Sequence, residues 1–369
     1  MEINYWLIAG GILIGLLLGF VIQRSKFCMA AAVSNLVLMK DTRQLHAYLA
    51  AIVVAVLGTQ LLQLTGLVAL DQAAYLKPQV NLVGALVGGL IFGIGTVFSG
   101  GCVGRTVVRA GEGNLGAVLV LLVAALMAAI TMYGPLEAFR MDISQSVPLA
   151  LSSETSSLRD IATSNQLFSY IVVFTLCLAL ISFLVLRLFR DKVQDRSLVA
   201  AGVFIGLLVV AGWFVTGFLS QDDFSIHRPS SLSFAGPLAN TAYMTLTGSS
   251  MSESAVFGML LLLGVVAGSL GSALLSRSFS WRLPELHNVK HLVMGGIFMG
   301  FGAVVAGGCN IGHGLSGAST LSVASLIAVI AIVLGMRVGL WLLIRSEDEQ
   351  VLPFKDWWVR RRRLFSLSK

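Results

Sequence analysis

Long apolar runs separated by short polar loops extend from one end of the chain to the other. A helix that crosses a membrane needs about 20 mostly apolar residues. Roughly nine runs meet this requirement: 5–22, 47–70, 80–99, 115–133, 167–186, 198–219, 255–275, 289–306 and 321–344. The pattern therefore predicts an all-α polytopic membrane protein with about nine transmembrane helices.

The distribution of Lys and Arg predicts how these helices are oriented, because cytoplasmic loops are enriched in both. An odd number of crossings places the termini on opposite sides. The basic tail, 346–369 with Arg360 to Arg363, then predicts a cytoplasmic C-terminus and an outer N-terminus. The loop charges agree: Arg24, Lys26, Lys40, Arg43, Arg187, Arg190, Lys192, Arg196, Arg277, Arg282 and Lys290 fall inside, whereas only Lys77, Arg140, Arg159 and Arg228 fall outside.

Three further segments do not fit a simple crossing. Phe27–Met39 is apolar but too short to span, and its basic flanks lie on one side, so we predict a re-entrant half-helix. The outer segments 134–166 and 220–254 are rich in Ser, Thr and Pro. Each is predicted to hold surface helices or a second re-entrant element.

Composition supports the membrane class and excludes others. Hydrophobic residues make up 56% of the chain and charged residues 12%, and the mean hydropathy is +0.87. The first run lacks a basic n-region and a cleavage site, so we expect it to be retained. The net charge of +7 is spread over loops and tail, which argues against a nucleic-acid partner. No phosphate-binding G-x-x-x-x-G-K-[ST] motif occurs, so direct use of ATP is not expected.

An internal repeat is the strongest single signal. The stretch Asn81–Cys102 matches Asn288–Cys309 at an offset of 207 residues. The matched pairs are Asn81/Asn288, Gly88/Gly295, Gly89/Gly296, Gly93/Gly300, Gly95/Gly302, Gly100/Gly307, Gly101/Gly308, Cys102/Cys309 and, after one inserted residue, Gly104/Gly312 and Arg105/His313.

The two copies lie on the third and eighth predicted helices, five crossings apart, so they run in opposite directions through the membrane. Such inverted-topology repeats are typical of transporters, whose binding site lies near the midplane. Gly11-x-x-x-Gly15 and Gly202-x-x-x-Gly206 form a weaker echo near the start of each half. We therefore expect a first repeat over 1–190, a second over 191–345 and the tail beyond.

The repeated glycines predict two different roles. Gly88, Gly89 and Gly93, with their partners, have the spacing of close helix packing. The consecutive pairs Gly100-Gly101 and Gly307-Gly308 instead suit a broken helix. Freed N–H groups and the positive end of a new half-helix would then face an anion.

The cysteines are the candidate chemical groups. Cys102 precedes Arg105 by three residues and Cys309 precedes His313 by four, which places thiol and basic side chain on one helical face. Cys28 follows Arg24 and Lys26 at the start of the predicted half-helix. Such basic surroundings lower the pKa of a thiol or attract an anion to it, so we expect Arg24, Lys26, Arg105 and His313 to help bind the substrate. Cys177 has no polar neighbour and is predicted to be a small buried hydrophobe.

Other uses of these thiols are weighed from the same residues. A zinc site would usually show close Cys or His pairs, which are absent, although three converging thiols could bind a soft ion such as Cu(I). A thiolate could also attack sulfane sulfur and carry a persulfide, as in a sulfurtransferase, but no general base lies near in sequence. We expect no metal, no cofactor and no enzymatic turnover; a passive anion channel remains a further alternative.

Three cysteine motifs, in order, carry a family resemblance. R-S-K-F-C at 24–28, F-S-G-G-C-V-G-R at 98–105 and A-G-G-C-N-I-G-H at 306–313 resemble those of the YeeE/YedE family of bacterial sulfur-compound transporters. The likeness extends from the first helix to the last.

The resemblance implies an hourglass-shaped permease of the bacterial inner membrane that imports thiosulfate. It implies that Cys28, Cys102 and Cys309 form a relay through the narrow part. The thiols would have to stay S–H donors, because a thiolate would repel a dianion. It also implies a cytoplasmic TusA-like sulfur-carrier partner, with membrane lipid around the chain. Two departures, the outer segment Ser146–Ser157 and the titratable His313, leave a selenium compound open as substrate.

Overall fold

The computed structural model describes residues 5–70, 73, 75–76, 79–145, 148–150, 174–175, 196–220, 228–248 and 253–366. Most of them are helical, and a two-stranded antiparallel sheet pairs Val80 with Leu149. The elements are α1 (Tyr5–Ser25), α2 (Met29–Met39), α3 (Arg43–Leu64), β1 (Gln79–Asn81), α4 (Leu82–Phe98), α5 (Val103–Gly111), α6 (Leu115–Tyr133), α7 (Glu137–Gln145), β2 (Pro148–Ala150), α10 (Arg196–Phe214), η2 (Val215–Leu219), α11 (Ala235–Thr247), α12 (Glu253–Leu275), η3 (Leu286–Asn288), α13 (Val289–Ala306), η4 (Gly312–Gly317) and α14 (Val323–Ser366).

Eight helices of the described residues are long and apolar enough to cross a membrane, which confirms the all-α polytopic class. Their bounds lie close to the predicted runs, and α6 matches 115–133. Helix α3 ends earlier than expected, because the chain turns at Gly66, whose φ is +69°. The ninth predicted run, 167–186 with Cys177, lies almost wholly outside the described residues, and so does the boundary between 190 and 191. The division into 1–190 and 191–345 therefore stays a prediction.

The two repeat helices, α4 and α13, pack antiparallel at the centre of the fold through their glycines. A Cβ on Gly95 would lie 2.6 Å from the backbone nitrogen of Met299, and one on its repeat partner Gly302 would clash with the backbone nitrogen of Phe92. Phe92 and Met299 are themselves matched positions, 207 residues apart. The contact is thus symmetric, as an inverted repeat requires.

The same symmetry governs the next layer of helices. Gly93 of α4 packs against the carbonyl of Ile332 in α14, and its partner Gly300 of α13 packs against the carbonyl of Ala124 in α6. In both cases an added Cβ would meet backbone, so the predicted packing role of these glycines is confirmed.

The weaker glycine echo is also symmetric in space. Gly15 of α1 abuts the carbonyl of Leu261 in α12, and Gly206 of α10 abuts that of Ala51 in α3. Helices α1 and α10 therefore hold equivalent places, and so do α3 and α12. Helix α11 lies between α10 and α12 in the chain, as α2 lies between α1 and α3. The predicted outer segment 220–254 therefore contains α11, the counterpart of the half-helix α2.

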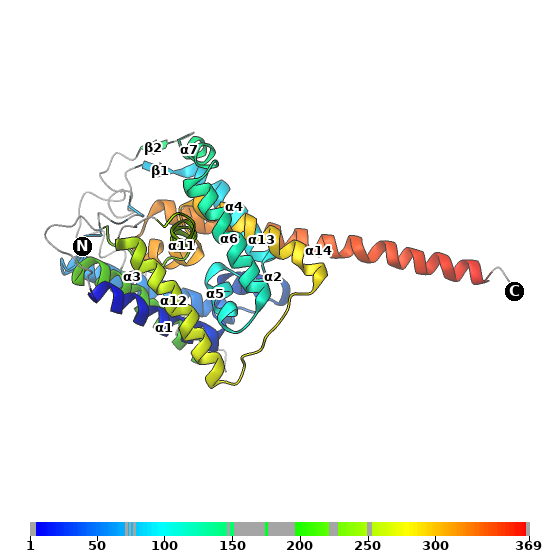
Figure 1. Cartoon of the computed structure of the whole chain (residues 1–369), viewed down its shortest axis with the longest axis horizontal. Coiled ribbons are helices and arrows are strands. Elements are labelled where there is room, and N and C mark those ends of the chain that lie inside the picture. Colours follow the sequence, from blue (N-terminus) through cyan, green and yellow to red (C-terminus); the bar gives the residue numbers. More distant parts are fainter. Residues whose placement is uncertain are drawn as a thin grey trace.

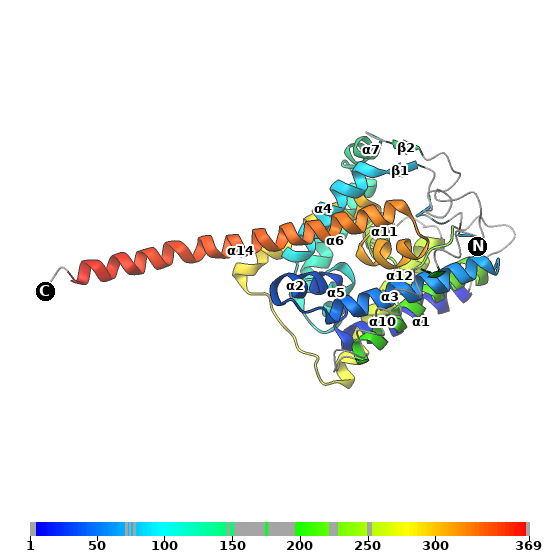
Figure 2. The ribbon, with the colours of Figure 1, turned by 180° about the vertical axis from the view of Figure 1, so that it is seen from behind.

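The two ends of the described chain lie at opposite ends of the molecule. Figures 1 and 2 show α1 beginning at one end, while α14 runs through the bundle and projects far beyond it at the other. Helix α7 and the small sheet lie toward the end where α1 begins.

Candidate functional site

Each of the three described cysteines directly precedes a short helix. Cys28 caps α2 and Cys102 caps α5, both with extended backbone, and the helical turn that leads into η4 begins after Cys309. The first backbone N–H groups of a helix have no partner within it, and they carry its positive end. Three such helix ends are therefore associated with thiols.

The predicted chain breaks are present at both glycine pairs. Gly100 has φ +72° and its partner Gly307 has φ +82°, a conformation that residues with a side chain rarely adopt. Both are exposed, whereas Gly101 and Gly308 behind them are buried. The main chain thus ends one helix and redirects before each cysteine, as the sequence predicts.

Two thiols from separate motifs meet. The Cys28 thiol donates a weak hydrogen bond to the Cys102 sulfur, with the sulfurs 3.7 Å apart. The side chains are 5% and 2% exposed. Backbone amides of Ala30 and Ala31, at the start of α2, face the Cys28 sulfur. This thiol pair lies in a closed part of the structure, surrounded by N–H donors.

Cys309 lies in a second, aromatic environment. It is 0% exposed, and its sulfur accepts a hydrogen bond from the Gly312 amide at 3.4 Å. A Cβ on Gly312 would lie 2.9 Å from the Tyr75 hydroxyl, 3.3 Å from the Ser233 hydroxyl and 3.7 Å from the Cys309 sulfur. Three polar groups therefore converge on this glycine, and the Tyr75 ring also meets His313 edge-on at 5.7 Å.

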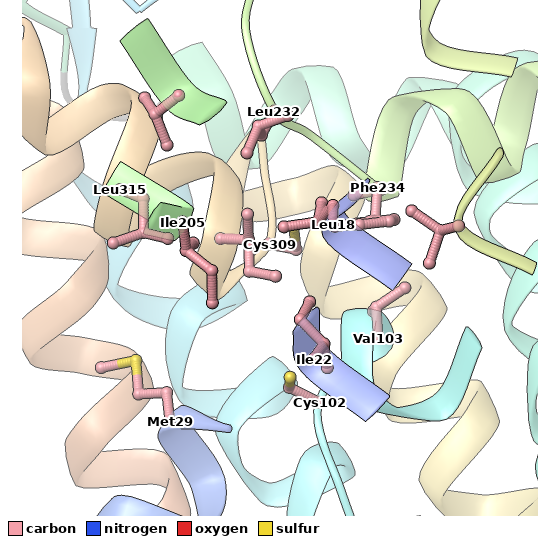
Figure 3. Close-up of a cluster of buried hydrophobic side chains, with 14 of the residues drawn as sticks. Leu18, Ile22, Met29, Cys102, Val103, Ile205, Leu232, Phe234, Cys309 and Leu315 are labelled. Carbon is pink, nitrogen blue, oxygen red and sulfur yellow. The ribbon is translucent and has the colours of Figure 1, made fainter. Parts of the chain in front are cut away.

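The two cysteine motifs touch each other inside the fold. A Cβ on Gly104 would lie 2.7 Å from Cδ1 of Ile311, from the other repeat, and 3.4 Å from the Phe234 ring. Figure 3 shows Cys102 and Cys309 among buried apolar side chains that include Ile22, Leu18 and Phe234. The turns that carry the thiols therefore come together in the protein core.

Tyr48 links the two environments and was not predicted from the sequence. Its hydroxyl donates to the backbone carbonyl of Asn310, in the second repeated motif, at 3.0 Å. Its ring stacks on Phe27 at 5.5 Å. An isolated Tyr in an apolar run gives no sequence signal, whereas Asn310, a polar residue directly after the second motif cysteine, could have been noticed.

Two of the predicted cations, Arg105 and Arg24, have partners of their own in the structure. Arg105 forms an ion pair with Glu112 at 3.1 Å, and neighbouring Arg109 donates to the Gly100 carbonyl at 3.1 Å. Arg24 lies over the Phe20 ring at 5.4 Å. Arg24 and Lys26 are exposed where α1 leads into α2. Their contact with an anion stays a prediction.

His313 connects two segments of the second repeat. One ring nitrogen, Nε2, lies 3.0 Å from the Ala306 carbonyl and the other, Nδ1, lies 3.0 Å from the Ser325 hydroxyl. A carbonyl can only accept, so Nε2 donates; in the neutral ring Nδ1 then accepts from the serine. His313 thus fastens the end of α13 to the start of α14, and its predicted role toward an anion stays untested.

No group of three or more His, Cys, Asp or Glu side chains in the described ranges is placed to hold a metal ion. The Cys28–Cys102 pair and Cys309 do not converge into such a group. The geometry therefore does not favour the soft-metal alternative.

The three cysteine motifs also lie within a stretch of the chain that matches a known protein family. The model of a family described as sulphur transport matches residues 24–338, a range that contains all three cysteine motifs. The chain belongs to this family. The match confirms the YeeE/YedE resemblance.

Two relatives of the family are similar over nearly their whole length. A protein named thiosulfate transporter TsuA from Escherichia coli (strain K12) is 28% identical over 354 residues, which cover 91% of this chain and 94% of the relative. A protein of the same name from Spirochaeta thermophila is 29% identical over 342 residues, which cover 91% of this chain and 98% of the relative.

Proposed function

We propose that the chain is an inner-membrane permease that imports thiosulfate, or a closely related sulfur-containing anion, along a path lined by Cys28, Cys102 and Cys309. The names of the two relatives support the substrate class. The observation that carries the proposal is the meeting of thiols from separate motifs, each at the start of a short helix, with the two repeats in contact.

This arrangement suits a desolvated oxyanion. Neutral S–H and backbone N–H donors, together with helix N-termini, stabilise negative charge without a fixed ion pair. Conduction requires binding that is favourable enough for entry and weak enough for release. Arg105, paired with Glu112, and Arg109, which donates to the Gly100 carbonyl, add cationic groups beside the first chain break.

The proposed direction follows the loop charges and the opposite chain ends, with the C-terminal end of α14 in the cytoplasm. Inward movement of an anion opposes a negative-inside potential by about 2.3 kcal/mol per charge per 100 mV. A dianion at 100 mV therefore needs about 4.6 kcal/mol, twice that value. Coupling to protons, or capture by a cytoplasmic TusA-like sulfur carrier, would supply this difference.

Uptake of radiolabelled thiosulfate tests the proposal, in cells that lack other routes for this anion. Cys102→Ala and Cys309→Ala should each abolish uptake while the protein still reaches the membrane. Cys177→Ala, from an apolar run without polar neighbours, serves as the control and should retain uptake. Wild-type uptake no greater than that of cells without the protein would refute the permease.

The close Cys28–Cys102 pair also favours a second candidate, a membrane sulfurtransferase. A cysteine thiolate would attack the sulfane sulfur of thiosulfate, the S–S bond would break with release of sulfite, and a cysteine persulfide would remain. Mass spectrometry of the purified protein after thiosulfate treatment should show no persulfide if the permease proposal holds. A stoichiometric persulfide on Cys28 or Cys102 would favour the second candidate.

Two further measurements separate the remaining alternatives. Equal flux of unrelated anions into liposomes would indicate a passive channel. Stronger competition by a selenium oxyanion than by unlabelled thiosulfate would indicate a selenium transporter.

A further inference from the structure

The side chain of Asn310 is buried, yet among the described residues it makes no hydrogen bond that would stabilise the fold. It is 1% exposed, and within the part of the chain that the structure describes neither its Oδ1 nor its Nδ2 has a hydrogen-bond partner. An unsatisfied buried polar group destabilises a protein by about 1–3 kcal/mol. Buried amides without partners are uncommon and call for an explanation.

Asn310 lies where the two repeats meet. It is the first residue of the turn that leads into η4, directly after Cys309. Its amide approaches the thiol of Cys102, from the other repeat, without forming a hydrogen bond of normal geometry. Its backbone is held in place, because the Tyr48 hydroxyl donates to its carbonyl. A fixed peptide thus presents this amide beside the Cys102 thiol of the other repeat, one residue after Cys309 in the chain.

The first repeat shows that a cysteine turn of this kind packs without an amide. In the first repeat the residue after the cysteine is Val103, which is apolar and 1% exposed. The second repeat has one residue more between its cysteine and the following glycine. An apolar side chain at 310 would avoid the desolvation penalty, as Val103 does.

We propose that Asn310 is an anion-coordinating residue of the transport path, and that its amide N–H groups bind an oxygen of a tetrahedral sulfur oxyanion between Cys102 and Cys309. The inference rests on the proposed function and adds to it a binding group outside the three thiols. A neutral amide suits this place, because it supplies two directed donors and keeps no fixed charge that would trap a dianion. Its carbonyl oxygen is free to accept from a thiol and so to keep that thiol an S–H donor.

The test is the concentration dependence of thiosulfate uptake by proteoliposomes with purified wild type and Asn310→Leu, a variant of similar volume without an amide. Loss of a hydrogen bond to a charged group should raise KM about 10- to 100-fold. The resistance of Asn310→Leu to unfolding by SDS should equal or exceed that of the wild type, because the substitution removes two unsatisfied polar atoms. A KM within twofold of wild type would overturn the proposal.

A matched control separates coordination from a structural role. Gln60 is also a buried amide, 2% exposed, and in the described structure its Oε1 has no partner, but its Nε2 donates to the Ser319 carbonyl. Gln60→Leu should lower stability and leave KM unchanged. If Asn310→Leu behaves like Gln60→Leu, with lower stability and unchanged KM, Asn310 is structural and the proposal is wrong.

Two further outcomes are distinguishable. Should Asn310→Leu fail to fold, Asn310→Ala removes the amide without adding volume; a raised KM supports the proposal and an unchanged KM refutes it. Failure of the proposed function looks different, because wild-type proteoliposomes would then take up no thiosulfate. Saturable wild-type uptake with an unaffected Asn310→Ala refutes only the role of Asn310.

Discussion

Replacement of Gly95 with alanine tests whether α4 and α13 are held in backbone contact by their glycines. The added Cβ would lie 2.6 Å from the Met299 nitrogen and 3.0 Å from the Gly295 carbonyl oxygen. Favourable contacts between nonbonded heavy atoms are about 3.5–4.0 Å, so the helices would have to separate locally by about 1 Å. Both obstructing atoms are backbone, and no side-chain rotation can relieve the clash. We expect the free energy of unfolding to fall by about 1–3 kcal/mol, as at other overpacked buried sites.

Unfolding in mixed micelles with increasing SDS, followed by circular dichroism, measures this change. Gly271→Ala in α12 is the matched control, because nothing lies within 4 Å of its added Cβ. Alanine favours a helix by about 0.5–1 kcal/mol over glycine, so the control should be unchanged or slightly more stable. Equal unfolding free energies for the Gly95 and Gly271 variants would refute the proposed backbone contact.

The remaining predictions concern the buried site. A thiol oxidant should link Cys28 to Cys102, whose sulfurs are 3.7 Å apart, and block uptake reversibly; mass spectrometry that finds both thiols free after oxidation would contradict the geometry. His313→Ala leaves its two partners unpaired and should lower the free energy of unfolding by about 1–3 kcal/mol, measured in the same SDS assay. Trp213→Phe removes the 3.1 Å hydrogen bond to the Ser319 hydroxyl and should lower the free energy of unfolding by about 1 kcal/mol. A variant as stable as the wild type would contradict this prediction.

Sequence alone determined the class and the plan of this protein. Apolar runs of spanning length specify membrane helices, because each helix satisfies its backbone hydrogen bonds internally and needs no distant partner. Repeated glycines at an offset of 207 residues predicted both the inverted repeat and the breaks at Gly100 and Gly307. Each spanning run, each copy of the motif and each chain break is a short contiguous segment, so it can be recognised from the sequence.

Tertiary structure alone decided which side chains meet. The Cys28–Cys102 contact joins residues 74 apart, and Tyr48 reaches Asn310 across 262 residues. The sequence places His313 beside Cys309, yet the fold turns its ring toward the Ala306 carbonyl and Ser325. Such contacts depend on how closely glycine faces let helices approach and at what register, which no single segment encodes. For that reason the thiols were predictable as a set, whereas the unpaired amide between them was not.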